Sequence, residues 1–180
     1  MKFTPLEIPD VLLIEPKVFE DARGFFFEIY REDLFKKHGI SHPFIQDNQS
    51  LSRASVLRGL HYQESPMGQA KLVRVIKGKA FDVAVDIRKK SKTFGKYVSA
   101  TLSEENHAML YIPEGFAHGF CTLADNTEFL YKVSKPYSPQ HERGIFWKDP
   151  AIGIAWPKSD REYILSERDR TYPLLREIIR

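Results

Sequence analysis

Three neighbouring stretches decide the fold: Val56-Leu-Arg-Gly-Leu-His-Tyr-Gln63, Lys71-Leu-Val-Arg-Val-Ile-Lys77 and Phe81-Asp-Val-Ala-Val-Asp-Ile-Arg88. In the second and third stretches, β-branched residues alternate with charged ones, which is the period of a strand that buries one face. Gly78 separates the second stretch from the third and indicates a turn. We therefore expect three consecutive strands, with His61 and Lys71 close enough to converge.

The same pattern continues along the chain at intervals of about eight to fifteen residues. Further strands are expected at 97–102, 108–112, 118–123 and 127–133. Regular spacing of short strands with Gly, Pro, Asn and Asp between them favours an antiparallel sandwich or closed barrel over a βαβ fold.

The N-terminal part predicts shorter elements. The apolar run 11–14 between Pro9 and Pro16 predicts an edge strand. A turn at 21–24 leads into a strand over 25–30, and residues 31–38 predict a short helix with early acids, late bases and Gly39 as its cap. The C-terminal residues 171–180 predict a helical turn or an extended tail.

Composition excludes several classes of protein. The 180 residues favour one domain over 1–180, with 42% hydrophobic and 28% charged residues. Acids and bases are interspersed at a net charge of +3, so the chain lacks the basic stripe of a nucleic-acid binder, and it has no apolar run of membrane length. The single Cys121 cannot form an intramolecular disulfide, and its apolar surroundings predict a buried, inert thiol. We expect a cytoplasmic protein.

The segment Pro113-Glu-Gly-Phe-Ala-His118 has the P-x-G-x-x-H form of the cupins, which are small β-barrels. In metal cupins this histidine is a ligand, together with an upstream His-x-His pair and a glutamate. Here the upstream segment is His61-Tyr-Gln-Glu64 and lacks the second histidine. The sequence therefore favours a barrel without a metal or other cofactor.

A histidine inside a metal-free barrel suggests acid–base chemistry. His61 is the candidate base because the ordinary pKa of histidine lies near neutrality. Lys71 is placed to hold the negative charge of an enolate, and Tyr131 to return a proton. The alternatives are that His61 is a structural residue and Tyr131 a core tyrosine.

Seven segments, in order and spacing, resemble the dTDP-4-dehydrorhamnose 3,5-epimerase family of the cupin superfamily. The resemblance extends from about Asp21 to Asp169. The segments are 21–28, 46–50, 57–63, 71–74, 81–86, 112–120 and 165–169. The family implies a mainly β, cupin-type double-stranded β-helix, or jelly-roll barrel, with a few short peripheral helices. It also implies a homodimer.

The resemblance implies the substrate dTDP-4-dehydro-6-deoxyglucose, inverted at C3 and C5 without a cofactor. By similarity, His61 removes the protons and Asp169 orients and charges its imidazole. Lys71 stabilises the enolate at O4, and Tyr131 reprotonates C5 from the opposite face. His118 contacts the substrate or orders the polar core.

The same resemblance implies which residues bind the nucleotide part of the substrate. Arg58 is expected to bind the diphosphate and Tyr137 to stack on thymine. The remaining expected substrate-binding residues are Arg23, Glu28, Gln46, Asp47, Asn48, Glu142 and Arg168. Two features depart from a simple match. Position 168 is arginine where the family implies lysine. A regular strand would point Arg58 and His61 to opposite faces, so serving one site needs a twist or bulge near Gly59, or a long reach by Arg58 round the barrel rim.

Three alternatives stay open at the level of sequence. One is a single-centre epimerase acting at C3 or C5 of a related 4-keto sugar nucleotide. The others are a metal-dependent cupin enzyme and a non-catalytic sugar-nucleotide binding module.

Overall fold

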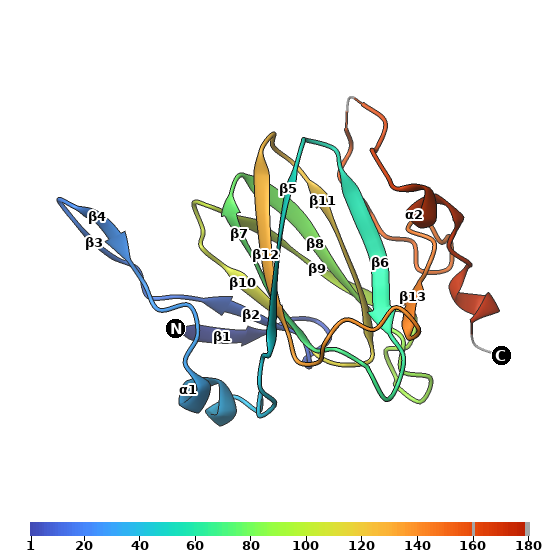
Figure 1. Cartoon of the computed structure of the whole chain (residues 1–180), viewed down its shortest axis with the longest axis horizontal. Helices are drawn as coiled ribbons and strands as arrows, with labels where there is room; N and C mark the ends of the chain where they lie inside the picture. The colour runs from blue at the N-terminus through green and yellow to red at the C-terminus, as the bar shows by residue number, and fades with distance from the viewer. Residues whose placement is uncertain (160, 179–180) are drawn as a thin grey trace.

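Two antiparallel sheets face each other in the computed structural model, which describes residues 1–159 and 161–178 (Figure 1). The six-stranded sheet has the order β1 (Lys2–Pro5), β2 (Leu12–Glu15), β10 (Met109–Ile112), β7 (Lys71–Lys77), β12 (Thr127–Val133) and β5 (Gln46–Ser52). The five-stranded sheet has the order β13 (Glu142–Gly144), β6 (Leu57–Gln63), β11 (Phe116–Thr122), β8 (Lys79–Asp86) and β9 (Tyr97–Ser103). The predicted mainly β jelly-roll architecture is confirmed.

The helices are short and lie outside the sheets, as expected. They are α1 (Glu32–Lys37), α2 (Glu167–Thr171) and the 3-10 turn η1 (Leu175–Glu177). Within the described part of the chain, none of them has the length and apolar character needed to cross a membrane.

The main core fills the space between the two sheets. Val73 and Val75 of β7 and Phe129 of β12 meet Ala84 of β8 and Phe120 of β11 there. The rings of Phe120 and Phe129 stack across the sheets with centroids 3.9 Å apart. Alternate residues of each strand supply this core, which is why the period-two pattern predicts the sheets.

A β-bulge in β6 turns Arg58 and His61 towards the same side. His61 pairs with His118 of β11, whereas Arg58 pairs with Phe120, so three steps along β6 match two along β11. Gly59 makes this possible: its φ is +135°, and a Cβ there would lie 2.6 Å from the Cα of Gly119. Of the alternatives that the sequence left open, the structure has the bulge near Gly59.

Most of the predicted strands are confirmed, but two predictions are wrong. The strand expected over 25–30 is short, because β4 (Gly24–Phe26) ends at Phe26 and residues 27–30 are not in a strand. The run near 11–14 was expected at a sheet edge, but β2 lies between β1 and β10. The reason is that Lys2–Pro5 forms an unpredicted strand outside it. The C-terminal prediction is confirmed as a helical turn at η1, while residues 179 and 180 lie outside the described residues.

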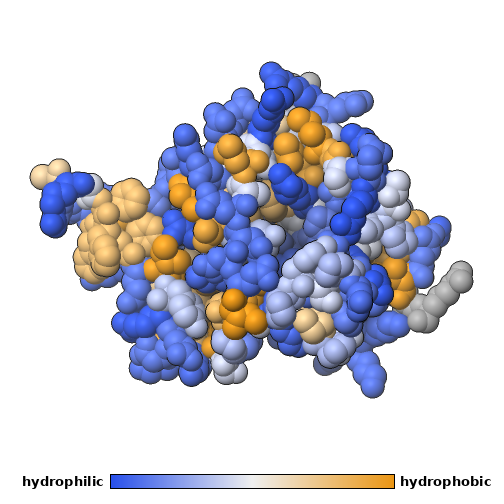
Figure 2. Space-filling model, viewed as in Figure 1, coloured by the Kyte–Doolittle hydropathy of each residue, from blue (hydrophilic) through white to orange (hydrophobic). Residues whose placement is uncertain are grey.

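A separate hairpin, β3 (Phe19–Asp21) and β4 (Gly24–Phe26), projects from one end of the molecule (Figure 1). Its apolar side chains face solvent: Phe19, Phe25 and Phe26 are 53%, 61% and 72% exposed. Figure 2 shows pale orange apolar side chains gathered at this end of the surface. Exposed clusters of this kind mark interaction surfaces.

Candidate active site

A cavity of about 240 Å³ opens between the two sheets beside α2. Both sheets contribute to its walls: His61 comes from β6 and His118 from β11, while Lys71 comes from β7 and Tyr131 from β12. Asp169 approaches from α2. The four residues expected to carry the chemistry are therefore brought together from positions up to 108 residues apart in sequence.

His61 and Asp169 form a close pair. His61 Nε2 lies 2.6 Å from Asp169 Oδ1, and Asp169 is only 3% exposed. Ser166 caps α2 by accepting a hydrogen bond from the Asp169 backbone N–H at 3.1 Å, which fixes the helix that presents the carboxylate. Burial raises the pKa of Asp169, but the hydrogen bond and charge of His61 outweigh it and hold that pKa below its usual value. The ionised carboxylate accepts the Nε2 hydrogen, so Nδ1 of the neutral ring is left as a base.

Lys71 is a buried residue of the cavity wall. Its Nζ donates a hydrogen bond to the backbone carbonyl of His61 at 3.3 Å. Burial lowers the pKa of Lys71 to about 8, and the charges of Asp82 and Glu142 oppose that shift. An ammonium held in a dry site is well suited to a developing oxyanion.

Tyr131 stands on the wall opposite His61. It pairs in register with Val73 of β7 and Asn48 of β5, so two neighbouring strands fix its backbone. Burial raises the pKa of its phenol, and the charge of Arg58 opposes the rise. Tyr131 therefore remains a proton donor at neutral pH. His61 and Tyr131 approach the cavity from the two different sheets.

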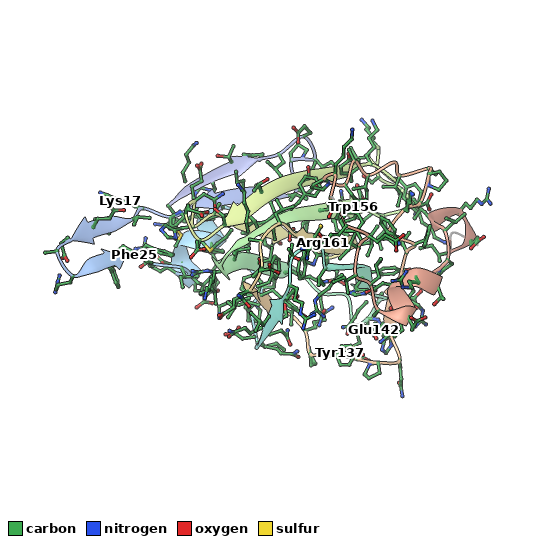
Figure 3. The ribbon with its side chains drawn as sticks, turned by 90° about the horizontal axis from the view of Figure 1, so that it is seen from above. Lys17, Phe25, Tyr137, Glu142, Trp156 and Arg161 are labelled. Carbon is green, nitrogen blue, oxygen red and sulfur yellow. The ribbon has the colours of Figure 1, made fainter. Side chains whose placement is uncertain are left out.

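The rim carries a chain of polar contacts. Tyr137 Oη donates to Glu142 Oε2 at 2.7 Å, and Arg168 Nη2 donates to the same oxygen at 2.5 Å. Gln46 Oε1 accepts from the Tyr137 backbone N–H at 3.0 Å. Figure 3 shows Tyr137 and Glu142 beside each other in one half of the molecule, with Phe25 of the hairpin in the other half. Arg58 lines the cavity and donates to Ser52 Oγ.

Three expected binding residues lie away from this cavity. Arg23 forms an ion pair with Asp21 on the projecting hairpin, and Glu28 faces Arg31. Asp47 lies on the outer side of β5, where it binds Lys132 at 2.8 Å. Asn48 accepts a hydrogen bond from Gln46 at 2.9 Å beside the rim.

Sequence reasoning missed several residues around the cavity. Gln49, Ser50, Phe120, Ser166 and Tyr172 contribute to its lining. Behind the lining, the buried carboxylate of Asp82 lies 3.0 Å from His118 Nε2. An acid within the otherwise apolar stretch Phe81-Asp-Val-Ala-Val85 was the available signal, because a buried carboxylate needs a partner.

Other features of the structure do not compete with this site. A larger hollow of about 570 Å³ borders Trp147, Trp156 and Tyr163, but its lining contains no histidine. Within residues 1–159 and 161–178, no group of three or more His, Cys, Asp or Glu side chains is arranged to hold a metal ion. Cys121 is buried, and burial raises the pKa of its thiol to about 11, as expected for an inert residue.

Comparison with known proteins agrees with the geometry. The family model described as dTDP-4-dehydrorhamnose 3,5-epimerase matches residues 5–177. The chain belongs to the dTDP-4-dehydrorhamnose 3,5-epimerase family. A family member from Salmonella typhimurium is 56% identical over 169 residues, which cover 93% of this chain and 92% of that protein.

Solved structures of the family share the whole fold. The epimerase from Legionella pneumophila, in complex with dTDP-4-keto-L-rhamnose, has a TM-score of 0.95 at 44% identity and covers 98% of this chain and 94% of its own. A 3'-monoepimerase from Streptomyces bikiniensis, in complex with dTDP-quinovose, has a TM-score of 0.89 at 36% identity and covers 96% and 87% of the two chains. The resemblance found in the sequence is confirmed at the level of family and fold.

Proposed function

We propose that this chain, acting as one domain over residues 1–180, is a dTDP-4-dehydrorhamnose 3,5-epimerase. It converts dTDP-4-dehydro-6-deoxy-D-glucose to dTDP-4-dehydro-L-rhamnose without a cofactor. The observation that supports the proposal is that one cavity is lined by the His61–Asp169 pair, by Tyr131 from the facing sheet and by the buried Lys71.

The C4 ketone of the substrate makes one site sufficient for two centres. It acidifies the C–H bonds at C3 and C5 alike, because loss of either proton gives an enolate with its charge on O4. His61 Nδ1 takes the proton, and Asp169 stabilises the imidazolium that forms. The Lys71 ammonium stabilises O4. In related oxyanion sites the loss of one such donor lowers kcat by about 10² to 10³.

Inversion requires a proton to return on the opposite face. Tyr131 donates its phenolic proton to C5 from the wall opposite His61, and the tyrosinate is then reprotonated from water. The neighbouring Arg58 charge stabilises that tyrosinate, consistent with its effect on the Tyr131 pKa. His118, held by Asp82, borders the sugar.

The nucleotide extends over the rim. Small-molecule pockets typically measure about 300–1,000 Å³, so a cavity of about 240 Å³ holds the sugar and leaves the nucleotide outside. Arg58 binds the diphosphate with its guanidinium, and the half-exposed ring of Tyr137 stacks on thymine. Arg168, Glu142, Gln46 and Asn48 order this rim.

A homodimer completes the proposal. Arg23, at the turn of the projecting hairpin, and Glu28, just after the hairpin, do not line the cavity of their own chain, so they reach a nucleotide if this segment of a second copy extends to the rim (Figure 1). The exposed phenylalanines of that hairpin supply an apolar surface for the contact. The enzyme works in the cytoplasm, where its free Cys121 stays reduced.

Analysis of the product sugar tests the function against the single-centre alternative. The 4-keto product is reduced with borohydride, hydrolysed and separated by chromatography. Inversion at both centres gives L-rhamnose and 6-deoxy-L-talose. Inversion at C3 alone gives 6-deoxy-D-allose and 6-deoxy-D-gulose, and that result would assign this chain to the single-centre epimerases.

A further inference from the structure

Asp82 is a buried carboxylate that the reaction as described does not use. It lies on β8, where Ala80 and Ala84 on the same face belong to the core between the sheets. Val83 and Val85, on the other face, pack beneath the C-terminal segment. Alternation therefore sends the Asp82 side chain towards the barrel interior, and it is 0% exposed.

The hydrogen bonds of Asp82 are incomplete. Its Oδ2 lies 3.0 Å from His118 Nε2, but its Oδ1 has no hydrogen-bond partner among the residues that the structure describes. Nearby Lys71 has three N–H donors, of which one binds the His61 carbonyl at 3.3 Å. A fully buried acceptor without a partner is costly, so such a group needs a specific role.

Asp82 does not line the cavity, although His118 and Lys71 both do. Its influence on a bound sugar must therefore pass through these two residues. Aromatic rings enclose this corner: the His118 ring lies 6.2 Å from those of Phe120 and Phe129, measured between centroids. In such low-dielectric surroundings the charge of Asp82 is weakly screened.

We propose that Asp82 is a positioning residue for the epimerase reaction: its carboxylate fixes the tautomer of His118 and holds Lys71 as an ammonium beneath O4 of the sugar. The inference rests on the proposed function, because it assumes that Lys71 meets the enolate. With Nε2–H directed to Asp82, His118 presents an unprotonated Nδ1, which can accept a hydrogen bond from a sugar hydroxyl.

The charge balance of the cluster supports this assignment. Burial lowers the pKa of Lys71 and of His118, and in both cases the charge of Asp82 is the largest opposing influence. Burial raises the pKa of Asp82 itself, and the interactions of Asp82 with His118 and Lys71 oppose that rise. The other titratable or charged groups around the cavity are Arg58, His61, Tyr131, Glu142, Arg168, Asp169 and Tyr172. Of these, Glu142 also favours the charged form of Lys71.

Asp82→Asn tests the proposal because it preserves shape and removes charge. The rate of solvent exchange at C3 and C5 is measured from pH 6.5 to 8.5. Lys71 acts as a cation, so activity is lost as pH rises through its pKa. If the substitution lowers that pKa from about 8 to about 7, the charged fraction at pH 8 falls about fivefold, with little change at pH 6.5. The ratio of variant to wild-type kcat should fall accordingly, and KM should change less than about threefold.

Asp86→Asn is the matched control. Asp86 is another fully buried aspartate on β8, but it binds Arg88, Ser91 and Thr93 away from the cavity. The ratio of the kcat of Asp86→Asn to that of the wild-type enzyme should stay constant across the same pH range. A pH-independent loss in Asp82→Asn, equal to that in Asp86→Asn, would reduce Asp82 to a structural residue and overturn the proposal.

Measurements on the wild-type enzyme keep the proposal testable if Asp82→Asn does not fold. Side-chain NMR should show an ionised Asp82 carboxylate at pH 7 and the Nε2–H tautomer of His118. A protonated Asp82 or the Nδ1–H tautomer would contradict it. These spectra also separate the two proposals: a wild-type enzyme without exchange activity refutes the epimerase function, whatever the state of Asp82.

Discussion

At the scale of single residues, the chemistry depends on how each side chain is charged. Asp169 remains ionised despite burial because His61 donates to it at 2.6 Å, and Tyr131 remains protonated because burial disfavours its anion. An ionised carboxylate that pairs with His61 and a protonated phenol therefore coexist in one cavity, as the proposed base and acid require. Because Asp169 and Tyr131 hold different protonation states, substituting each of them should impair the reaction in a different way.

Tyr131→Phe should separate the two centres. It removes the proton donor on the wall opposite His61, so inversion at C5 should be lost while some exchange at C3 remains. Deuterium incorporation at each carbon, followed by proton NMR, measures both. Tyr111→Phe is the control, because Tyr111 is a buried tyrosine of the same sheet outside the cavity. Equal loss at C3 and C5 in Tyr131→Phe would contradict its role.

Asp169→Asn should lower kcat at both centres by at least about a hundredfold. An amide cannot stabilise the His61 imidazolium, and it permits the wrong tautomer; the analogous change in serine proteases costs about 10⁴. Glu167→Gln on the same helix should leave kcat within about twofold of wild type, because Glu167 is exposed outside the cavity. Activity of Asp169→Asn near that of the control would exclude Asp169 as the partner of His61.

At the scale of elements, the bulge in β6 determines whether Arg58 and His61 share one site. Gly59 combines a φ of +135° with a 2.6 Å approach of its absent Cβ to Gly119. Strain and overpacking each cost about 1–3 kcal/mol at such positions. The bulge therefore depends on Gly59 and on Gly119, the residue of β11 that lies against it.

Gly59→Ala should lower the free energy of unfolding by about 3 kcal/mol and impair exchange even under conditions where the protein is folded. Denaturant unfolding measures the first effect. Gly153→Ala is the control: Gly153 also has a positive φ, +65°, but its nearest neighbour would lie 3.8 Å from a Cβ, so a loss of about 1 kcal/mol is expected. Equal losses for the two variants would show that the close approach in the bulge is unimportant.

The elements differ in how far the sequence predicts them. Strands such as β7 and β12 follow from alternation, since one face of each is buried. Helix α2 has only five residues and no apolar period, so its cap at Ser166 was its sole signal. Sequence patterns also do not show which side chains meet across the barrel. For this reason Asp82 and Tyr172 were missed, whereas His61 and Lys71 were found. Family resemblance, rather than pattern, identified Asp169 and Tyr137.

At the scale of the whole molecule, the hairpin β3–β4 projects away from the sheets, and none of its residues lines the cavity (Figure 1). In the proposed dimer, the hairpin of one copy would bring its Arg23 to the nucleotide bound by the other. Phe26, 72% exposed, is the most exposed of the large apolar side chains in the hairpin. Its burial in a dimer would contribute to association through the hydrophobic effect.

Phe26→Asp should weaken dimerisation at least about tenfold, because a charge would be buried in the contact. Sedimentation equilibrium measures the dissociation constant. Leu123→Asp, at an exposed apolar residue outside the hairpin, should leave it unchanged. A wild-type protein that sediments as a monomer at micromolar concentration would contradict the dimer.

Proton NMR of dTDP-4-dehydro-6-deoxyglucose in deuterium oxide, with chelator-treated enzyme, examines the proposed mechanism most directly. The H3 and H5 signals should both disappear with wild-type enzyme, and both should persist with His61→Ala, because one base serves both carbons. His38→Ala, at an exposed histidine on the far side of the fold, should behave as wild type. Exchange retained in His61→Ala, or exchange that requires an added metal, would contradict a single metal-free base acting at two centres.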